Sequence, residues 1–199
     1  MKKIVLMGII IVLTIIIYFC FNDNKILYVN IGDDILYKYN YQNDVINYLK
    51  KNKNYENYIE YRKENYRITD FVNDIEQNTL YKDNKTVKNL LIKADIITLW
   101  VGTNDIYYKI NETDSNQLYH YLDDVLEDME NLFDLLRKNS KEKIIVMGIN
   151  HKNPDKLEYF AYFNQKLNEL CNEYNMDFVD TNNKNKSLIS NEIIKKIKK

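Results

Sequence analysis

The chain is poor in cysteine, histidine and uncompensated charge. One of its two cysteines, Cys20, lies in an apolar N-terminal run and the other, Cys171, is alone in the rest of the chain, so no internal disulfide is expected. The 28 basic and 29 acidic residues are spread evenly and give a net charge of −1, which argues against nucleic acid as a partner. Two histidines leave little choice for an imidazole base. Glycine and proline are also scarce, and 18 tyrosines make the composition typical of an AT-rich bacterial genome.

An uninterrupted apolar run opens the chain. Residues 4–21 (IVLMGIIIVLTIIIYFCF) carry no charge and follow Lys2 and Lys3. As a helix they would span roughly 27 Å, enough to cross a thin hydrocarbon core. No small residues mark a cleavage site, so the prediction is an uncleaved anchor rather than a removed signal peptide. Residues 1–22 would then be a single-pass anchor in the lipid membrane, with residues 23–199 forming one extracytoplasmic domain.

The remainder of the chain alternates β-type runs with amphipathic helices. With 45% hydrophobic residues it can bury a real core. The runs predict strands at residues 25–32, 58–61, 95–102, 143–149 and 176–180. Helical periodicity predicts helices at residues 34–50, 68–78, 86–94, 116–138, 157–174 and 187–199. Such alternation predicts an α/β fold with a parallel sheet covered by helices on both faces.

Polar residues follow four of the predicted strands. They are Asp33–Asp34, Thr103–Asn104–Asp105, Asn150–His151 and Asp180–Asn183. Ligands of open parallel sheets bind outside the carboxyl ends of the strands, so these segments form the candidate site.

Three segments resemble conserved blocks of the SGNH or GDSL hydrolases. They are YVNIGDDIL, ENYRITDFVNDI and LWVGTNDIYY, and the similarity extends over nearly all of residues 25–199. The most specific of these pieces is GTND after a buried strand. The family contains esterases, lipases and lysophospholipases, and the resemblance implies a flavodoxin-like three-layer α/β/α sandwich.

The resemblance also assigns roles to individual positions. Asp34 stands in the slot of the nucleophilic serine, and Asn104 matches the asparagine that helps to bind the oxyanion. Asn65 replaces the glycine whose N–H completes the oxyanion hole. Asp180 matches the aspartate that orients the base, and Asn183 stands where the histidine belongs. The resemblance implies that further residues line the site as binding positions: Gly32, Asp33, Asn65, Gly102, Asp105 and His151.

The two histidines do not replace the missing base. His120 falls on the polar side of a long helix and is expected at the surface, whereas His151 follows a strand on the site side of the sheet. Without the serine and the expected histidine, several orders of magnitude in rate are lost. The sequence therefore predicts a catalytically degenerate, membrane-anchored binding or accessory protein, with an acyl or glycan ligand and no cofactor.

Two alternatives remain at this point. The chain could be an active acyl-ester hydrolase with a non-standard catalytic set. Alternatively, Asp33, Asp34 and Asp105 could form an acidic site for Mg²⁺ or Ca²⁺, which prefer oxygen ligands.

Overall fold

A computed structural model describes residues 25–82, 84–110, 114–150 and 154–199. In this part of the chain, five parallel strands form the main sheet: β1 (Ile26–Gly32), β2 (Tyr55–Arg62), β5 (Ile96–Trp100), β6 (Lys143–Met147) and β7 (Asp177–Val179). Their order is β2-β1-β5-β6-β7. The connection from β1 places β2 on one side of β1, whereas β5, β6 and β7 follow on its other side. The strand order therefore reverses at β1, and the gap between β1 and β5 is a topological switch point.

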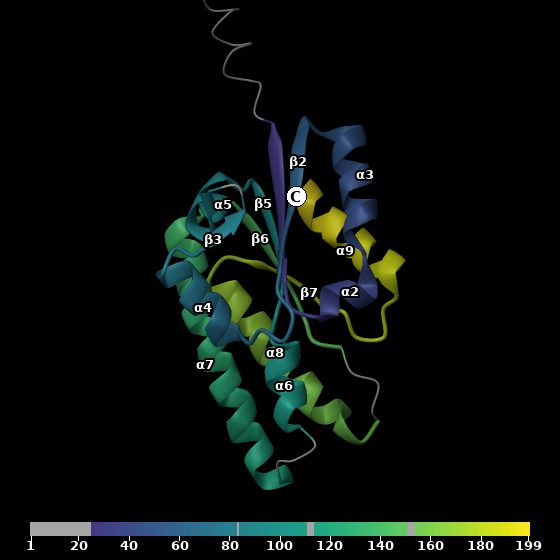
Figure 1. Ribbon diagram of the computed structural model, residues 1–199. Helices are drawn as coiled ribbons and strands as arrows, with labels where there is room; N and C mark the ends of the chain where they lie inside the picture. Colours follow the sequence, from purple (N-terminus) through teal and green to yellow (C-terminus); the bar gives the residue numbers. More distant parts are fainter. Residues whose placement is uncertain (1–24, 83, 111–113, 151–153) are drawn as a thin grey trace, which may run out of the picture.

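Helices cover both faces of the sheet (Figure 1). One face carries α2 (Ile35–Tyr39), α3 (Gln42–Asn52) and α9 (Lys186–Lys198). The other carries α4 (Ile68–Glu76), α5 (Val87–Lys93), α6 (Thr103–Lys109), α7 (Ser115–Asn139) and α8 (Leu157–Glu173). The short 3₁₀ helix η1 (Pro154–Lys156) precedes α8. The predicted three-layer α/β/α architecture with a parallel sheet is confirmed.

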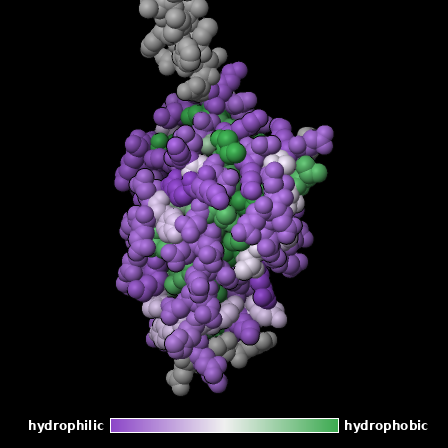
Figure 2. Space-filling model, turned by 90° about the vertical axis from the view of Figure 1, so that its left-hand side faces the viewer, coloured by the Kyte–Doolittle hydropathy of each residue, from purple (hydrophilic) through white to green (hydrophobic). Residues whose placement is uncertain are grey.

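The core is built from continuous apolar strands. Every residue of β5 is buried, and β6 is buried from Ile144 to Met147. Such runs suit strands that are covered on both faces. The visible surface is mainly hydrophilic, with apolar side chains scattered between polar ones (Figure 2).

Three local details differ from the sequence prediction. The helix expected over residues 34–50 is two helices, because Asn40 adopts a left-handed conformation with φ of 42° after α2. A two-stranded sheet of β3 (Leu80–Lys82) and β4 (Lys85–Thr86) was not predicted, since both strands are too short to show a period. The short helix α6 follows β5 where a loop was expected.

None of the helices in the described ranges is long and apolar enough to cross a membrane. The predicted anchor, residues 1–22, lies outside the described residues.

Candidate functional site

The candidate site forms where β1 and β5 end side by side. Gly32 closes β1, and a Cβ atom there would lie 2.7 Å from the carbonyl oxygen of Trp100 and 2.5 Å from Leu36 Cδ1. Only glycine allows this approach. The backbone N–H of Asp33 then donates to the Trp100 carbonyl at 3.2 Å, so the loops after the two strands leave the sheet together.

Asp33 is a buried connector between these loops. Its Oδ1 accepts from the Ile35 N–H at 3.0 Å and its Oδ2 from the Thr103 N–H at 2.9 Å. Burial raises the pKa of this carboxyl to about 6, against the opposing effect of its backbone hydrogen bonds. Both oxygens are engaged in holding the site together rather than exposed to a ligand.

Asp105 likewise connects two segments through its carboxylate, here the start of α4 and α6. Its carboxylate accepts from the Ile68 N–H, with Oδ2 at 3.2 Å, and so fixes the start of α4 against α6. Burial raises its pKa to about 6 as well. No group of three or more His, Cys, Asp or Glu residues in the described ranges could hold a metal ion. The acidic-site alternative therefore gains no support from the described geometry.

Asp34 is the half-buried centre of the site. Its Oδ2 accepts two hydrogen bonds, from the backbone N–H of Asn65 at 2.8 Å and from the side-chain Nδ2 of Asn104 at 2.8 Å. The same Asn104 amide group also donates to the carbonyl oxygen of Tyr66 at 3.0 Å, which fixes its orientation. Three segments that are distant in sequence thus meet at one carboxylate oxygen.

Local backbone geometry explains why these donors point at Asp34. Asn65 has φ of 58°, in the left-handed region, where asparagine is among the few residues other than glycine that are tolerated. Gly102, with φ of 96°, precedes α6 and turns Asn104 back toward β1. The predicted binding residue Gly102 therefore acts through its backbone.

The last predicted block does not join this cluster. Asp180 is exposed and its Oδ1 accepts from the Asn182 N–H at 2.9 Å, closing its own turn. Asn183 is exposed, with φ of 54°. No hydrogen bond or ion pair between described residues links either of them to Asp34. Their assignment as orienting acid and base positions stays a prediction.

The two histidines provide no base within the described geometry. His120 is exposed on α7, as expected. His151 lies outside the described residues.

Asn150, which the sequence placed among the candidate segments, joins three parts of the chain at this end of the sheet. Asn150 donates through Nδ2 to the Tyr39 hydroxyl at 3.0 Å and to the Thr181 carbonyl at 3.1 Å, and its own carbonyl accepts from the Tyr107 hydroxyl at 2.8 Å. It thereby ties the loop after β6 to α2, α6 and the last block. Its place after a predicted strand is the signal that put it among the candidate segments, whereas these contacts were not predicted.

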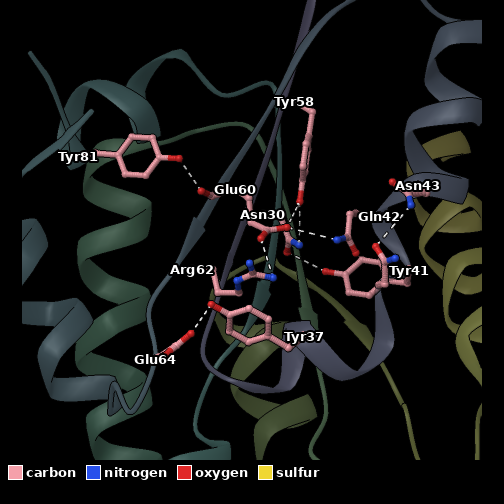
Figure 3. A network of polar contacts seen from close by, with 11 residues as sticks. Asn30, Tyr37, Tyr41, Gln42, Asn43, Tyr58, Glu60, Arg62, Glu64 and Tyr81 are labelled. Carbon is pink, nitrogen blue, oxygen red and sulfur yellow. Dashed lines mark hydrogen bonds and ion pairs between the residues drawn. The ribbon is translucent and has the colours of Figure 1, made fainter. Parts of the chain in front are cut away.

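Sequence reasoning missed a polar network inside the sheet (Figure 3). Asn30 Oδ1 accepts from Tyr41 at 2.8 Å and from Thr98 at 2.9 Å, and all three residues are fully buried. On β2, the Arg62 guanidinium stacks on the Tyr37 ring, 3.4 Å from its centroid, and Tyr37 donates to Glu64 at 2.6 Å. Isolated polar residues in apolar strands carry no periodic signal that could have revealed this network.

A family model of GDSL-like lipases and acylhydrolases matches residues 31–192. The chain belongs to the GDSL-like lipase/acylhydrolase family. Several solved structures share the fold of this GDSL-like chain. The lipase Lip_vut3 from a goat rumen metagenome is 13% identical with a TM-score of 0.66, and the alignment covers 79% of this chain and 81% of the lipase.

Two other solved structures have the same fold at similarly low identity. A catalytic mutant of Axe2, an acetylxylan esterase from Geobacillus stearothermophilus, is 16% identical with a TM-score of 0.58, covering 85% of this chain and 80% of Axe2. AlinE4, an SGNH-hydrolase family esterase, is 14% identical with a TM-score of 0.55, covering 78% and 76%. No curated protein matches the chain.

Proposed function

We propose that this GDSL-like protein is catalytically degenerate and acts as a binding or accessory protein on the outer side of a membrane. One observation carries the proposal: Asp34 Oδ2 accepts from both the Asn65 N–H and the Asn104 amide. In the resembling hydrolases these two donors belong to the oxyanion hole. Here a carboxylate of the protein itself takes the place of the substrate oxygen.

Two physical effects oppose hydrolysis at such a site. A negative charge in the hole repels the negative charge that develops on the substrate oxygen in the transition state, so electrostatic stabilisation is lost. Carboxylate attack on an ester would also produce an anhydride, and Asp34 has no described imidazole bonded to it that could activate water.

Exposed tyrosines on α2 and α6, the helices that follow β1 and β5, favour a glycan over a bare acyl chain as the ligand. Tyr37 on α2 is 52% exposed and Tyr108 on α6 is 59% exposed, next to the two segments that hold the site together. Arg67 lies over the Tyr108 ring, 4.1 Å from its centroid. Flat aromatic faces with a polar edge suit the C–H faces and hydroxyl groups of sugars.

Membrane attachment is the second part of the proposal. It is supported by the uncharged run of residues 4–21 after Lys2 and Lys3, which fits a single-pass anchor with the domain outside the cytoplasm. Flotation of the full chain with lipid vesicles after a high-salt or carbonate wash tests this part directly.

A p-nitrophenyl acetate assay on the full chain in detergent tests the catalytic part. We expect no turnover above that of the Asn104→Ala variant, even at high protein concentration. Turnover by the natural sequence that disappears in Asn104→Ala would establish the competing function, an ester hydrolase with a non-standard catalytic set.

Binding is tested separately with acetylated xylo-oligosaccharides and peptidoglycan fragments as probes. We expect Tyr37→Ala and Tyr108→Ala to weaken retention, while Tyr119→Ala, which removes an exposed tyrosine from α7, leaves it unchanged. Failure of the natural sequence to retain any of these probes would contradict the glycan assignment.

A further inference from the structure

Basic side chains gather at the end of the domain where the strands begin. In a parallel sheet, the helices that precede the strands finish at this same end. The last turns of α3, α5, α7 and α9 all contain exposed lysines: Lys50 and Lys51, Lys93, Lys138, and Lys198.

Helix dipoles alone do not account for this distribution. A dipole favours a cation in the last turn of a helix, and that effect explains each of those lysines separately. Lys25, Lys53 and Lys141 are also exposed at this end, but Lys53 and Lys141 lie between a helix and a strand, and Lys25 directly precedes β1. We call the surface that these eight lysines form the basic end.

The acidic groups at this end do not cancel the lysines. The Asp95 carboxylate accepts from the Leu27 N–H at 2.7 Å, and Asp177 pairs with Lys143 and Lys196 at 3.7 and 3.2 Å. Among the described residues, exposed carboxylates near this end include Glu56, Asp134, Glu142 and Glu173, fewer than the eight lysines. None of the eight lysines of the basic end forms an ion pair with another described residue.

A groove of about 690 Å³ opens at the same end, between β2 and α5. Lys25, Lys85 and Lys93 line it, with Glu56, Asp95 and apolar groups such as Leu27 and Leu90, so cations outnumber carboxylates in its lining. On α5, Ile92, which precedes the lining residue Lys93 in the chain, is 62% exposed. Cations next to exposed aliphatic side chains are the combination found at membrane–water interfaces.

The described chain begins at this end of the domain. Lys25 is its first residue, and β1 starts directly after it, at the same end as the start of β2 (Figure 1). The apolar run stops at Phe21, so at most about 13 Å of extended chain separates it from Lys25.

We propose that the basic end rests on anionic phospholipid headgroups of the membrane that holds the anchor. This inference depends on the proposed membrane attachment. The occupant follows from charge complementarity and from the short distance between the apolar run and Lys25. At low salt, each lysine close to an anionic membrane surface raises the membrane-binding constant roughly fivefold.

This orientation turns the candidate site away from the membrane. The Tyr121 hydroxyl of α7 donates to the backbone carbonyl of Asp105, so the site lies level with Tyr121. From Tyr121 to Lys138 the same helix rises roughly 25 Å. Lipids of the anchoring bilayer are therefore out of reach of Asp34, and the ligand belongs to the space beyond the membrane, as a glycan would.

The test uses the full chain with Cys20→Ser, reconstituted into nanodiscs that contain a nitroxide-headgroup lipid. A fluorophore is attached at Asn52→Cys, in the last turn of α3, or at Asn183→Cys, near the candidate site. In discs with phosphatidylglycerol, we expect strong quenching at position 52 and little at position 183. Quenching at position 52 should fall in pure phosphatidylcholine, in high salt, and in the triple variant Lys50→Glu, Lys51→Glu, Lys53→Glu. The matched variant Lys109→Glu, Lys184→Glu, Lys186→Glu should leave it unchanged.

The outcomes separate this inference from the proposed attachment. Equal quenching at both positions, or quenching at position 52 that does not depend on lipid charge, would overturn the docked orientation. If the chain nevertheless stays in the discs, the proposed anchor is upheld. A chain that cannot be retained in either type of disc overturns both.

Discussion

The side-chain amide of Asn104 lies 2.8 Å from Oδ2 of Asp34, a residue 70 positions earlier in the chain. The same oxygen accepts the Asn65 N–H at 2.8 Å. Asp34 thus acts as an internal acceptor for donors from two other segments. This pairing gives Asp34 a structural role in holding these segments together.

The first prediction concerns the energetic coupling of this pair. Charge-assisted hydrogen bonds are stronger than neutral ones, but Asp34 is only half-buried, so we expect a coupling free energy of about 1 kcal/mol. Urea unfolding of Asp34→Ala, Asn104→Ala and the double variant gives this quantity from a double-mutant cycle. Additive losses would mean that the two side chains do not stabilise each other.

The second prediction concerns the left-handed backbone of Asn65. Asn65→Gly should change the free energy of unfolding by less than about 0.5 kcal/mol, whereas Asn65→Val should cost about 1–2 kcal/mol, because a branched Cβ is strained at φ of 58°. Thermal unfolding measures both changes.

A matched control for this position is Asn183, which is exposed and has φ of 54° but no hydrogen bond to Asp34. The same two substitutions there should show the same conformational cost. A Val variant at position 65 as stable as the natural sequence would contradict the assigned conformation.

The third prediction is that Asp33 and Asp105 make the folded state less stable as pH rises, the opposite of an ordinary paired carboxylate. Burial raises both folded-state pKa values from 3.8 to about 6, so between these pH values the folded chain holds more protons than the unfolded chain. By linkage, this contribution makes the folded state less stable as pH rises from about 4 to 6, and the loss persists above pH 6.

Denaturant midpoints measured across pH 3.5–7 check this sign, which opposes that of an ordinary paired carboxylate. Each group contributes on the order of 1 to 3 kcal/mol. Asp105→Asn should flatten the slope between pH 4 and 6, while a change at the exposed Asp180, such as Asp180→Asn, should not. An unchanged slope in Asp105→Asn would contradict the assignment.

The fourth prediction tests the network inside the sheet. The Tyr41 hydroxyl donates to Asn30 at 2.8 Å and lies 3.2 Å from the Thr98 hydroxyl, with no solvent exposure. Tyr41→Phe leaves a buried acceptor with fewer donors and should cost about 1–2 kcal/mol of unfolding free energy. Tyr37→Phe, which removes an exposed hydroxyl bonded to Glu64, is the control and should cost less than about 0.5 kcal/mol.

Much of the fold follows from patterns that are local in the chain. The apolar run of Ile96–Trp100 and the periodic face of α7 are visible in single windows of sequence, because burial on both faces or on one stripe imposes a residue type on each position. The break at Asn40 was missed because one residue in a left-handed conformation leaves no periodic trace.

The candidate site, too, could be predicted only in part from the sequence. Sequence alone located the polar strand ends and the family blocks, since these are properties of residue type and spacing, while the substitutions that it suggests at residues 34, 65 and 183 stay predictions. Only the tertiary structure decided that Asp34 accepts the donors of Asn65 and Asn104, and that the carboxylates of Asp33 and Asp105 are committed to backbone amides. Hydrogen bonds between residues 31 or 70 positions apart depend on how the strand ends converge in space, and no local pattern encodes that distance.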